Sequence, residues 1–220
     1  MVGEDIARAA LEINAIKLSP NDPFTWASGY KMPIYNDNRM FLFDPTNRRM
    51  IANSFYEAVG DLNFDIVAGT STAGIPHAAI LSDKFSKPMI YVRDKPKGHG
   101  LRNQIEGIDA DGDLEGYRVL LIEDLISTGS SSARAVQAIR DANGECNNCY
   151  SIFDYGLRKS VDAFTQLDPD CNVKSLLDYD TLLRVAKDIG YINDTQASML
   201  QEWREDPFGW GEANGFSRVE

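Results

Sequence analysis

The chain has 220 residues, of which 43% are hydrophobic and 25% are charged. This composition is typical of a globular protein with a packed core, and it excludes a disordered chain, collagen and a long coiled coil. The 33 acidic residues outnumber the 22 basic ones, which gives a net charge of −11 at pH 7. So acidic a surface repels nucleic acid, and we therefore expect no nucleic-acid partner.

The N-terminal segment MVGEDIARAALEINAIKL is acidic and amphipathic, whereas a secretory signal is first cationic and then apolar. No apolar run approaches the ~18 residues that a membrane span needs, so we expect no membrane partner. The three cysteines, Cys146, Cys149 and Cys171, are an odd number and argue against a disulfide framework. Because the Cys146-x2-Cys149 spacing has no second pair, we expect free thiols rather than a zinc site. These features favour a cytoplasmic protein.

The first part of the chain predicts a helix, a hairpin and a second helix. One face of the first helix would carry Ile6, Ala9, Ala10, Ile13 and Ile16. The aromatic and β-branched segment FTWASGYKMPIYNDNR turns at Ser28-Gly29, which is typical of paired strands. Asp44-Pro45 supplies a capping residue and then proline at the first helical position, and we expect that helix to end near Gly60.

From residue 64 onward, short apolar segments alternate with amphipathic ones. Strands are predicted over 64–69, 88–93, 118–124 and 149–155, and helices over 74–85, 131–143, 178–189 and 194–205. Such alternation is typical of βαβ units, so the predicted fold class is α/β, with a mostly parallel sheet flanked by helices. We interpret residues 1–220 as a single domain in which residues 1–45 include an N-terminal cap.

Two adjacent carboxylates, Glu123 and Asp124, end the apolar strand of 118–124. Ligands of such sheets bind at the carboxyl ends of the strands. Carboxylate oxygens suit the hydroxyl groups of a sugar, or water bound to Mg²⁺. The residues from Ser127 to Ser131 then open a helix, and their amide and hydroxyl groups suit a phosphate monoester. The pattern predicts a site for a ribose 5-phosphate.

Two other strand ends carry residues suited to anions. In GTSTAG, residues 69–74, small side chains let backbone N–H groups approach an anion at the start of a helix. Ile75-Pro76 follows where a nucleoside-triphosphate loop needs Lys and Ser/Thr, so we expect a different anion. The segment 91–107 gathers five cationic or titratable side chains in an otherwise acidic chain: Arg93, Lys95, Lys97, His99 and Arg102. We expect a mobile loop over 94–117 that closes over a polyphosphate.

Four motifs, in this order, resemble those of the type I phosphoribosyltransferases and, among them, the orotate phosphoribosyltransferases. They are FTWASGYKMPIYNDNR, GTSTAGIP, YVRDKPKGHG with the trailing IEG, and IEDLISTGSSS. The resemblance spans about residues 18–158 and implies the type I phosphoribosyltransferase-like fold with a small N-terminal cap, or hood. It also implies an enzyme that transfers a 5-phosphoribosyl group from phosphoribosyl pyrophosphate (PRPP) to orotate. The products would be orotidine 5′-monophosphate and pyrophosphate, in the biosynthesis of UMP.

The resemblance further implies roles for individual residues. Lys97, His99 and Asp124 would be catalytic, with the first two in the mobile loop. PRPP would be bound by Thr70, Ser71, Arg93, Lys95, Lys97, His99, Glu123, Asp124, Leu125, Ile126, Ser127, Thr128, Gly129, Ser130 and Ser131. Orotate would be bound by Ser127, Lys31 and Tyr35. The cofactor would be Mg²⁺, held mainly by PRPP with Glu123 and Asp124 nearby, and the assembly would be a homodimer with shared active sites.

Some positions depart from the pattern of many family members. Ala27 and Ala73 stand where many have lysine, and Asp94 stands where a second lysine is common. Tyr155 stands where many have an arginine that helps to bind orotate. Three cations are candidates for binding the orotate carboxylate in its place: Lys31, Arg39 and Arg158.

Two alternative functions stay open. A related transferase would use a purine or another pyrimidine, and it would lack the FTWASGYKMPIY motif. A regulator that senses PRPP without catalysis would carry a basic nucleic-acid-binding surface or an added domain, and it would lack the catalytic loop.

Overall fold

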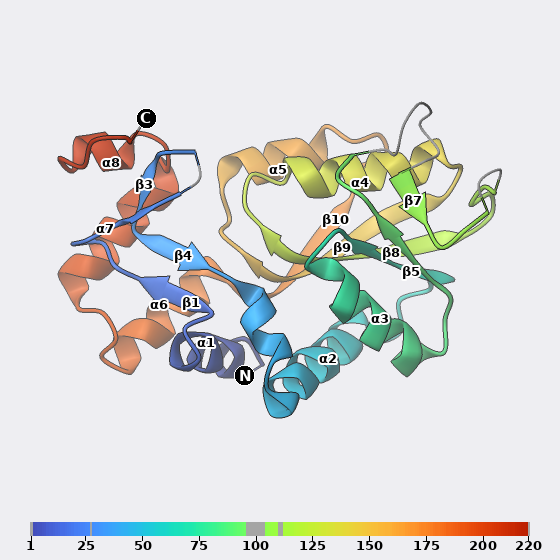
Figure 1. Cartoon of the computed structure of the whole chain (residues 1–220), viewed down its shortest axis with the longest axis horizontal. Coiled ribbons are helices and arrows are strands. Elements are labelled where there is room, and N and C mark those ends of the chain that lie inside the picture. Colours follow the sequence, from blue (N-terminus) through green and yellow to red (C-terminus); the bar gives the residue numbers. More distant parts are fainter. Residues whose placement is uncertain (1, 27, 96–103, 110–111, 220) are drawn as a thin grey trace.

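The computed structural model describes residues 2–26, 28–95, 104–109 and 112–219. Within these ranges the main sheet is built from β5 (Ile66–Thr70), β6 (Met89–Val92), β7 (Ile105–Glu106), β8 (Arg118–Ile126), β9 (Glu145–Asp154) and β10 (Asn172–Asp178). Their order is β10-β9-β8-β5-β6-β7 (Figure 1). Neighbouring strands run parallel, except that β7 is antiparallel to β6. The predicted α/β class and mostly parallel sheet are therefore confirmed.

Helices flank both faces of this sheet (Figure 1). On one side lie α4 (Ser130–Asp141) and α5 (Arg158–Thr165), and on the other α1 (Val2–Glu12), α2 (Pro45–Val59) and α3 (Gly74–Phe85). The central strand β8 is apolar on both faces, because Val119 and Leu121 pack in one core and Leu120 and Ile122 in the other. After Arg118 at its start, β8 carries apolar side chains up to Ile122, and Glu123 and Asp124 follow towards its carboxyl end, where the chain leaves the core.

Several predicted elements are confirmed together with their end signals. Asp44 caps α2, and its carboxylate accepts hydrogen bonds from the N–H groups of Thr46 and Asn47 at 2.8 and 3.0 Å. The helix ends before Gly60, as expected. The helix predicted over 74–85 is α3, and those predicted over 178–189 and 194–205 are α6 (Tyr179–Asp188) and α7 (Asp194–Glu205).

The first helix is shorter than predicted. It ends at Glu12, and Asn14 has a left-handed backbone with φ of 59°, a conformation that asparagine tolerates better than most residues. The chain then turns into β1 (Ile16–Leu18), which pairs antiparallel with β4 (Ile34–Asn36). Ile16 is therefore buried from a strand and not from the helix face that we expected.

The hairpin predicted around Ser28-Gly29 is confirmed. Its strands are β2 (Phe24–Thr25) and β3 (Lys31–Met32), which pair antiparallel, and Gly29 supplies the positive φ of 82° that the turn needs. After β4 the chain forms a short 3-10 helix, η1 (Asn38–Leu42), and then enters α2.

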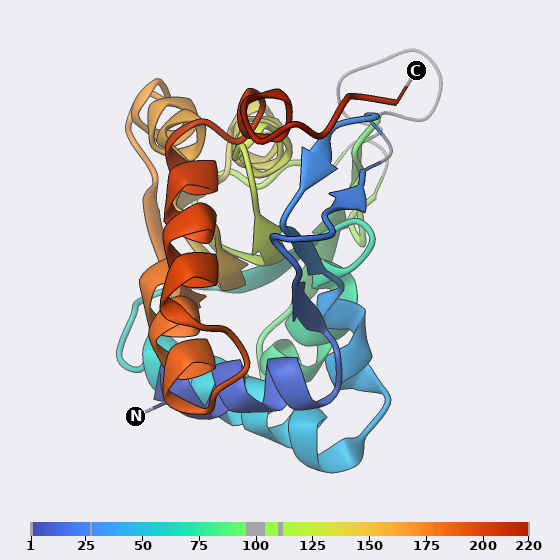
Figure 2. The same cartoon turned by 90° about the vertical axis from the view of Figure 1, so that its left-hand side faces the viewer.

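The C-terminal segment packs against this hairpin. Figure 2 shows α6, α7 and α8 (Trp210–Ala213) beside the N-terminal strands. Trp203 of α7 is fully buried, with its ring centre 6.5 Å from that of Trp26 and 5.3 Å from that of Tyr155. Near the end of the chain, the N–H of Val219 donates to the carbonyl of Gly29 at 3.0 Å. The C-terminal segment thus packs against the hairpin of β2 and β3 and stabilises it.

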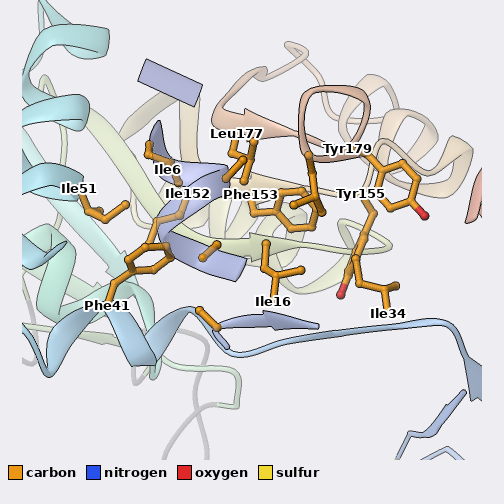
Figure 3. Packing of buried hydrophobic residues seen from close by; sticks show 14 of the residues in the cluster. Ile6, Ile16, Ile34, Phe41, Ile51, Ile152, Phe153, Tyr155, Leu177 and Tyr179 are labelled. Carbon is orange, nitrogen blue, oxygen red and sulfur yellow. The ribbon is translucent and has the colours of Figure 1, made fainter. Parts of the chain in front are cut away.

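Cap and sheet share one hydrophobic core. Figure 3 shows Ile16 and Ile34 of the β1–β4 pair near Phe153 and Tyr155, which lie at the end of β9. Cys146, Cys149 and Cys171 are all buried and unpaired. In the described part of the chain, we find no helix with the length and apolar character that a membrane crossing would require.

Candidate active site

The carboxylate of Glu123 lies inside the protein, with 6% of the residue exposed. Successive side chains of a strand point to opposite faces, so Glu123 and Asp124 diverge although they are adjacent. Oε1 of Glu123 accepts hydrogen bonds from the Thr70 hydroxyl at 2.6 Å and from the N–H of Asp124 at 3.0 Å. Oε2 accepts one from the Ser132 hydroxyl at 2.8 Å. The buried charge is therefore well supplied with donors.

Burial is also the main influence on the ionisation of this acidic pair. It raises the pKa of Glu123, and the adjacent carboxylate of Asp124 raises it further, while the Thr70 and Ser132 hydroxyls act in the opposite direction. Burial raises the pKa of Asp124 as well. The pair therefore retains a proton to higher pH than exposed carboxyl groups do.

The loop after β8 presents backbone N–H groups at the start of α4. Gly129 has a φ of 74° and directly precedes the helix, whose first N–H groups take no side-chain cap among the described residues. A side chain at this position would place its Cβ 3.0 Å from Cα of Ser160. Glycine is favoured here, because the backbone angle strains other residues and α5 leaves little room for a Cβ atom. Such a helix start is suited to an anion.

The segment 69–74 joins β5 to α3 at the same edge of the sheet. A Cβ atom on Gly74 would lie 2.5 Å from both the Ile122 carbonyl oxygen and the Thr70 hydroxyl. The start of α3 therefore packs directly on the backbone of β8, which holds Thr70 close to Glu123.

A cavity of about 420 Å³, here called the polar cavity, opens between these strand ends. Its lining comes from the ends of β5, β6 and β8 and from the first turns of α4: Thr70, Ser71, Val92, Arg93, Asp94, Gln104, Glu123, Asp124, Leu125, Ser131, Arg134 and Ala135. Two of its cations are paired, Arg134 with Asp94 at 2.8 Å and Arg93 with Glu106 at 3.4 Å. Hydroxyl groups, carboxylates and guanidinium groups thus converge on one space.

A second cavity, of about 480 Å³, adjoins the first and is here called the aromatic cavity. It is lined by Thr25, Trp26, Ser28, Tyr35, Asn36, Leu125, Ser127 and Tyr155. Leu125 belongs to both linings, so the two spaces meet at the end of β8. The cap supplies the wall opposite the sheet, and its rings suit a flat, aromatic ligand.

Comparison with known proteins agrees with this geometry. A family model described as "Phosphoribosyl transferase domain" matches residues 44–176. The chain is 46% identical over 215 residues to an orotate phosphoribosyltransferase of Listeria innocua, covering 96% of this chain and 99% of that protein. The chain is also 47% identical over 206 residues to an orotate phosphoribosyltransferase of Halalkalibacterium halodurans, covering 93% of this chain and 95% of that protein. The chain belongs to the orotate phosphoribosyltransferase family. Its fold is similar to the crystal structure of orotate phosphoribosyltransferase from Aeropyrum pernix, with a TM-score of 0.70 at 24% identity over 86% of this chain and 99% of that one.

The structure brings many of the predicted site residues of this family to the two cavities. Those that line the polar cavity are Thr70, Ser71, Arg93, Glu123, Asp124, Leu125 and Ser131. Ser127 and Tyr35 line the aromatic cavity. Lys95 lies next to the polar cavity, since its carbonyl accepts a long hydrogen bond of 3.5 Å from Arg93. Lys97 and His99 lie outside the described residues.

The remaining predicted residues lie beside the cavities. Thr128 and Gly129 precede α4 and Ser130 is its first residue, with the hydroxyls of Thr128 and Ser130 3.4 Å apart. The side chain of Ile126 is in the core, and its carbonyl accepts from the N–H of Tyr155. Ile126 can therefore contact PRPP only through its backbone atoms.

Two features of the cavity walls were not predicted from the sequence. Arg134, one helical turn after Ser130, lines the polar cavity, and the helical spacing of 130–134 is the signal that could have found it. Trp26 and Tyr155 line the aromatic cavity, but their rings meet only through the tertiary fold, with centres 6.2 Å apart.

The three candidates for binding the orotate carboxylate differ in their surroundings. Arg39 is held by both carboxylate oxygens of Asp37, at 2.6 and 2.9 Å. Arg158 is exposed at the start of α5, and none of the three side chains belongs to the lining of either cavity. Lys31 donates to the hydroxyl of Thr25 at 2.7 Å, and Thr25 lines the aromatic cavity. Lys31 is thus the candidate with a neutral partner at the cavity wall.

Proposed function

We propose that this protein transfers the 5-phosphoribosyl group of PRPP to N1 of orotate, releasing pyrophosphate and forming orotidine 5′-monophosphate. The observation that carries the proposal is the junction of the two cavities at Leu125. A polar cavity with carboxylates and a helix start suits a phosphorylated sugar, and the adjoining aromatic cavity suits a planar base. The reacting carbon of the sugar would lie where the two spaces meet.

In this proposal the polar cavity binds PRPP. Asp124 at its wall accepts hydrogen bonds from the ribose hydroxyls, and Ser127 to Ser131 bind the 5′-phosphate through backbone N–H and hydroxyl groups. Arg93 and the segment 69–74 lie on the side where the pyrophosphate would leave. Lys97 and His99, with Asp124, are the proposed catalytic residues.

The chemistry requires opposite charges to be stabilised at two places. Breaking the anomeric bond gives the sugar positive character, as in glycoside cleavage. The carboxylate of Asp124 stabilises that charge, while cationic side chains stabilise the negative charge on the departing pyrophosphate. Exclusion of water from the closed site prevents hydrolysis of PRPP.

Magnesium fits the donor set of the polar cavity. Mg²⁺ is usually held by one or two carboxylates together with phosphate oxygens of the substrate. Asp124 offers a carboxylate at the cavity wall, and we propose that PRPP supplies most of the other ligands. When bound, Mg²⁺ would neutralise part of the charge of the leaving pyrophosphate. In the described ranges, no three His, Cys, Asp or Glu side chains are grouped as a metal site of their own.

The aromatic cavity binds orotate in this proposal. Trp26, Tyr35 and Tyr155 offer rings on which a pyrimidine can stack, and Ser127 connects this cavity to the phosphate loop. Lys31 binds the orotate carboxylate. The enzyme then acts in UMP biosynthesis, as a homodimer with shared active sites in the cytoplasm. The three unpaired buried cysteines are compatible with that reducing compartment.

The assay that tests the proposal follows the loss of orotate absorbance. We expect consumption of orotate only when PRPP and Mg²⁺ are both present, and none of uracil, hypoxanthine or adenine under the same conditions. Consumption of a purine instead would favour the related transferase. Binding of PRPP without turnover of any base would favour the sensor, and full activity in excess chelator would exclude the metal.

A further inference from the structure

Three elements of the polar cavity are joined by one buried hydrogen-bond network. Its centre is the carboxylate of Glu123 near the end of β8. Thr70 donates to it from the end of β5 at 2.6 Å, and Ser132 donates from the first turn of α4 at 2.8 Å. Glu123 and Thr70 are each 6% exposed and Ser132 is 1% exposed, so solvent does not replace these contacts.

Each hydroxyl is directed to Glu123 by its surroundings. The other acceptor within reach of Thr70 is the Ile122 carbonyl, at 3.4 Å, which is much the weaker contact. The start of α3 lies close to this hydroxyl, since a Cβ atom on Gly74 would stand 2.5 Å from it. Ser132 has Glu123 as its hydrogen-bond acceptor, across nine residues of the chain. Both carboxylate oxygens are thereby held in one orientation.

The neighbours of these two residues line the cavity. Ser71 follows Thr70 and Ser131 precedes Ser132, and both Ser71 and Ser131 belong to the cavity wall. The N–H of Asp124 donates to the same Glu123 carboxylate at 3.0 Å, and its carbonyl accepts from the buried Asn38 at 2.7 Å. The network therefore fixes three walls of the polar cavity relative to one another.

We propose that Thr70 and Ser132 are positioning residues for phosphoribosyl transfer, which act by holding the Glu123 carboxylate and with it the walls that meet PRPP. This inference rests on the proposed function, since it assigns PRPP to the polar cavity. It adds Ser132 to the functional residues. It also changes the role of Thr70, which acts by its hydrogen bond to Glu123 and not by binding PRPP itself. Orotate, which belongs to the other cavity, is affected much less.

The test compares hydroxyl deletions in the network with a matched deletion elsewhere. Ser132→Ala and Thr70→Val each remove one donor to Glu123, and we expect each to lower kcat/KM for PRPP about tenfold or more. The KM for orotate should change less than about twofold. Thr70→Ser keeps the hydroxyl and should restore most of the activity. The control is Ser54→Ala on α2, where a serine that is also 6% exposed donates to the Met50 carbonyl at 2.8 Å and lines neither cavity.

A double-mutant cycle tests whether Ser132 acts through Glu123. Once Glu123→Ala has removed the acceptor, adding Ser132→Ala should cost little more in kcat/KM for PRPP, since the interaction is already lost. Full additivity would mean that Ser132 acts by another route. Near-ultraviolet circular dichroism and urea unfolding show whether each variant keeps the wild-type fold.

Two results would overturn the proposal. One is a Ser132→Ala variant whose kcat/KM for PRPP is the same as that of Ser54→Ala. The other is a Thr70→Val variant that loses kcat/KM equally for PRPP and for orotate, with no recovery in Thr70→Ser. Calorimetric titration with PRPP and Mg²⁺, without any base, separates this question from the proposed function. If orotate is not the acceptor, weaker PRPP binding by Ser132→Ala would still support the network, and unchanged binding would reject it.

Discussion

Lys31 occupies an unusual position for a cation in an acidic protein. It lies on β3 opposite Thr25 of β2, and its ammonium group has the Thr25 hydroxyl as its hydrogen-bond partner at 2.7 Å. Arg39, by contrast, has its charge matched by Asp37. A lysine with a neutral partner at the wall of the aromatic cavity is available to an anionic ligand there. Because Tyr155 stands where the resemblance implies an arginine that helps to bind orotate, we expect another cation to take that role in this chain.

Lys31→Met is therefore expected to raise the KM for orotate about tenfold or more, because a hydrogen bond between charged groups contributes about 1.5–3 kcal/mol. The KM for PRPP should stay near the wild-type value. Steady-state kinetics with each substrate varied in turn measures both effects. Arg158→Gln serves as the control, since that exposed cation, unlike Lys31, has no hydrogen bond to a residue of the aromatic cavity in the described part of the chain. If Arg158→Gln raises the KM for orotate and Lys31→Met does not, the residue that binds the orotate carboxylate has been assigned wrongly.

His77 on α3 is a buried histidine of the core, 3% exposed, with its ring 6.3 Å from that of Phe55. Burial lowers its pKa from 6.5 to about 4, because the cationic form is poorly solvated there. Between these values the unfolded chain binds a proton and the folded protein does not. The contribution of His77 to stability is thus present above pH 6.5 and is lost as the pH falls towards 4.

We expect this residue to lower the free energy of unfolding by roughly 2 kcal/mol between pH 7 and pH 5. His77→Gln should remove that part of the pH dependence, whatever its effect at pH 7. Urea unfolding of both proteins at the two pH values gives the difference directly. The comparison of the two proteins is needed because the raised pKa values of Glu123 and Asp124 stabilise the fold as the pH falls, which is opposite to the effect of His77. Equal pH dependence in both proteins would show that His77 accepts a proton in the fold.

At the scale of elements, the loop between β8 and α4 depends on Gly129. This residue combines a φ of 74° with a close approach to α5, where an added Cβ would lie 3.0 Å from Cα of Ser160 and 3.2 Å from the Phe164 ring. Gly190, between α6 and α7, has a similar φ of 72°, but nothing lies within 4 Å of its added Cβ. The two glycines therefore separate backbone strain from steric contact.

Gly190→Ala should destabilise the protein by about 1 kcal/mol, the cost of a left-handed conformation for alanine, and Gly129→Ala by more than that, because its Cβ atom also contacts α5. Gly129→Ala alone should also raise the KM for PRPP, because the loop must move away from α5 and its N–H groups lose their alignment. Thermal unfolding and steady-state kinetics of the pair measure the two effects. A similar rise in KM for Gly190→Ala would mean that general destabilisation, and not the loop, is responsible.

The elements that the sequence predicted are those with local signals. Asp44-Pro45 marks the start of α2 by its own chemistry, and the apolar run before Glu123 identifies the central strand. The elements that were missed lack such signals. The strand of Ile105–Glu106 has two residues and lies within the stretch predicted as a loop, and it exists because it pairs with β6. Likewise the sequence signals predict neither β10 nor α5, although β10 pairs with β9 along most of its length.

The same distinction applies to the site. Glu123, Asp124 and the phosphate loop are contiguous in sequence, so their common location at a strand end could be predicted. For the aromatic cavity, the resemblance indicated Ser127 and Tyr35, but the contact of Trp26 with Tyr155 could not be predicted, because the two residues are far apart in the chain and meet only after the hairpin folds onto β9. The contact of Ser132 with Glu123 depends on which face of α4 is turned to β8, and the sequence of three serines does not distinguish them.

At the scale of the whole molecule, the acidic character of the chain creates a problem for an anionic substrate. The net charge is −11, and the described cations of the polar cavity, Arg93 and Arg134, are already in contact with carboxylates. PRPP therefore needs further positive charge, which Mg²⁺ and the cationic residues of 94–117 would supply. In the proposed homodimer that segment belongs to one subunit and serves the site of the other.

Mixed dimers test this arrangement directly. Lys97→Ala and Asp124→Asn should each leave a nearly inactive homodimer, for different reasons. If Lys97 acts on the partner's site, a dimer of one subunit of each kind has one site that lacks both groups and one site that lacks neither. Unfolding and refolding an equal mixture makes half of the dimers mixed, so roughly a quarter of the wild-type activity should return. If Lys97 acts within its own subunit, every site keeps one defect, and a mixture whose mixed dimers are verified by native mass spectrometry would stay inactive.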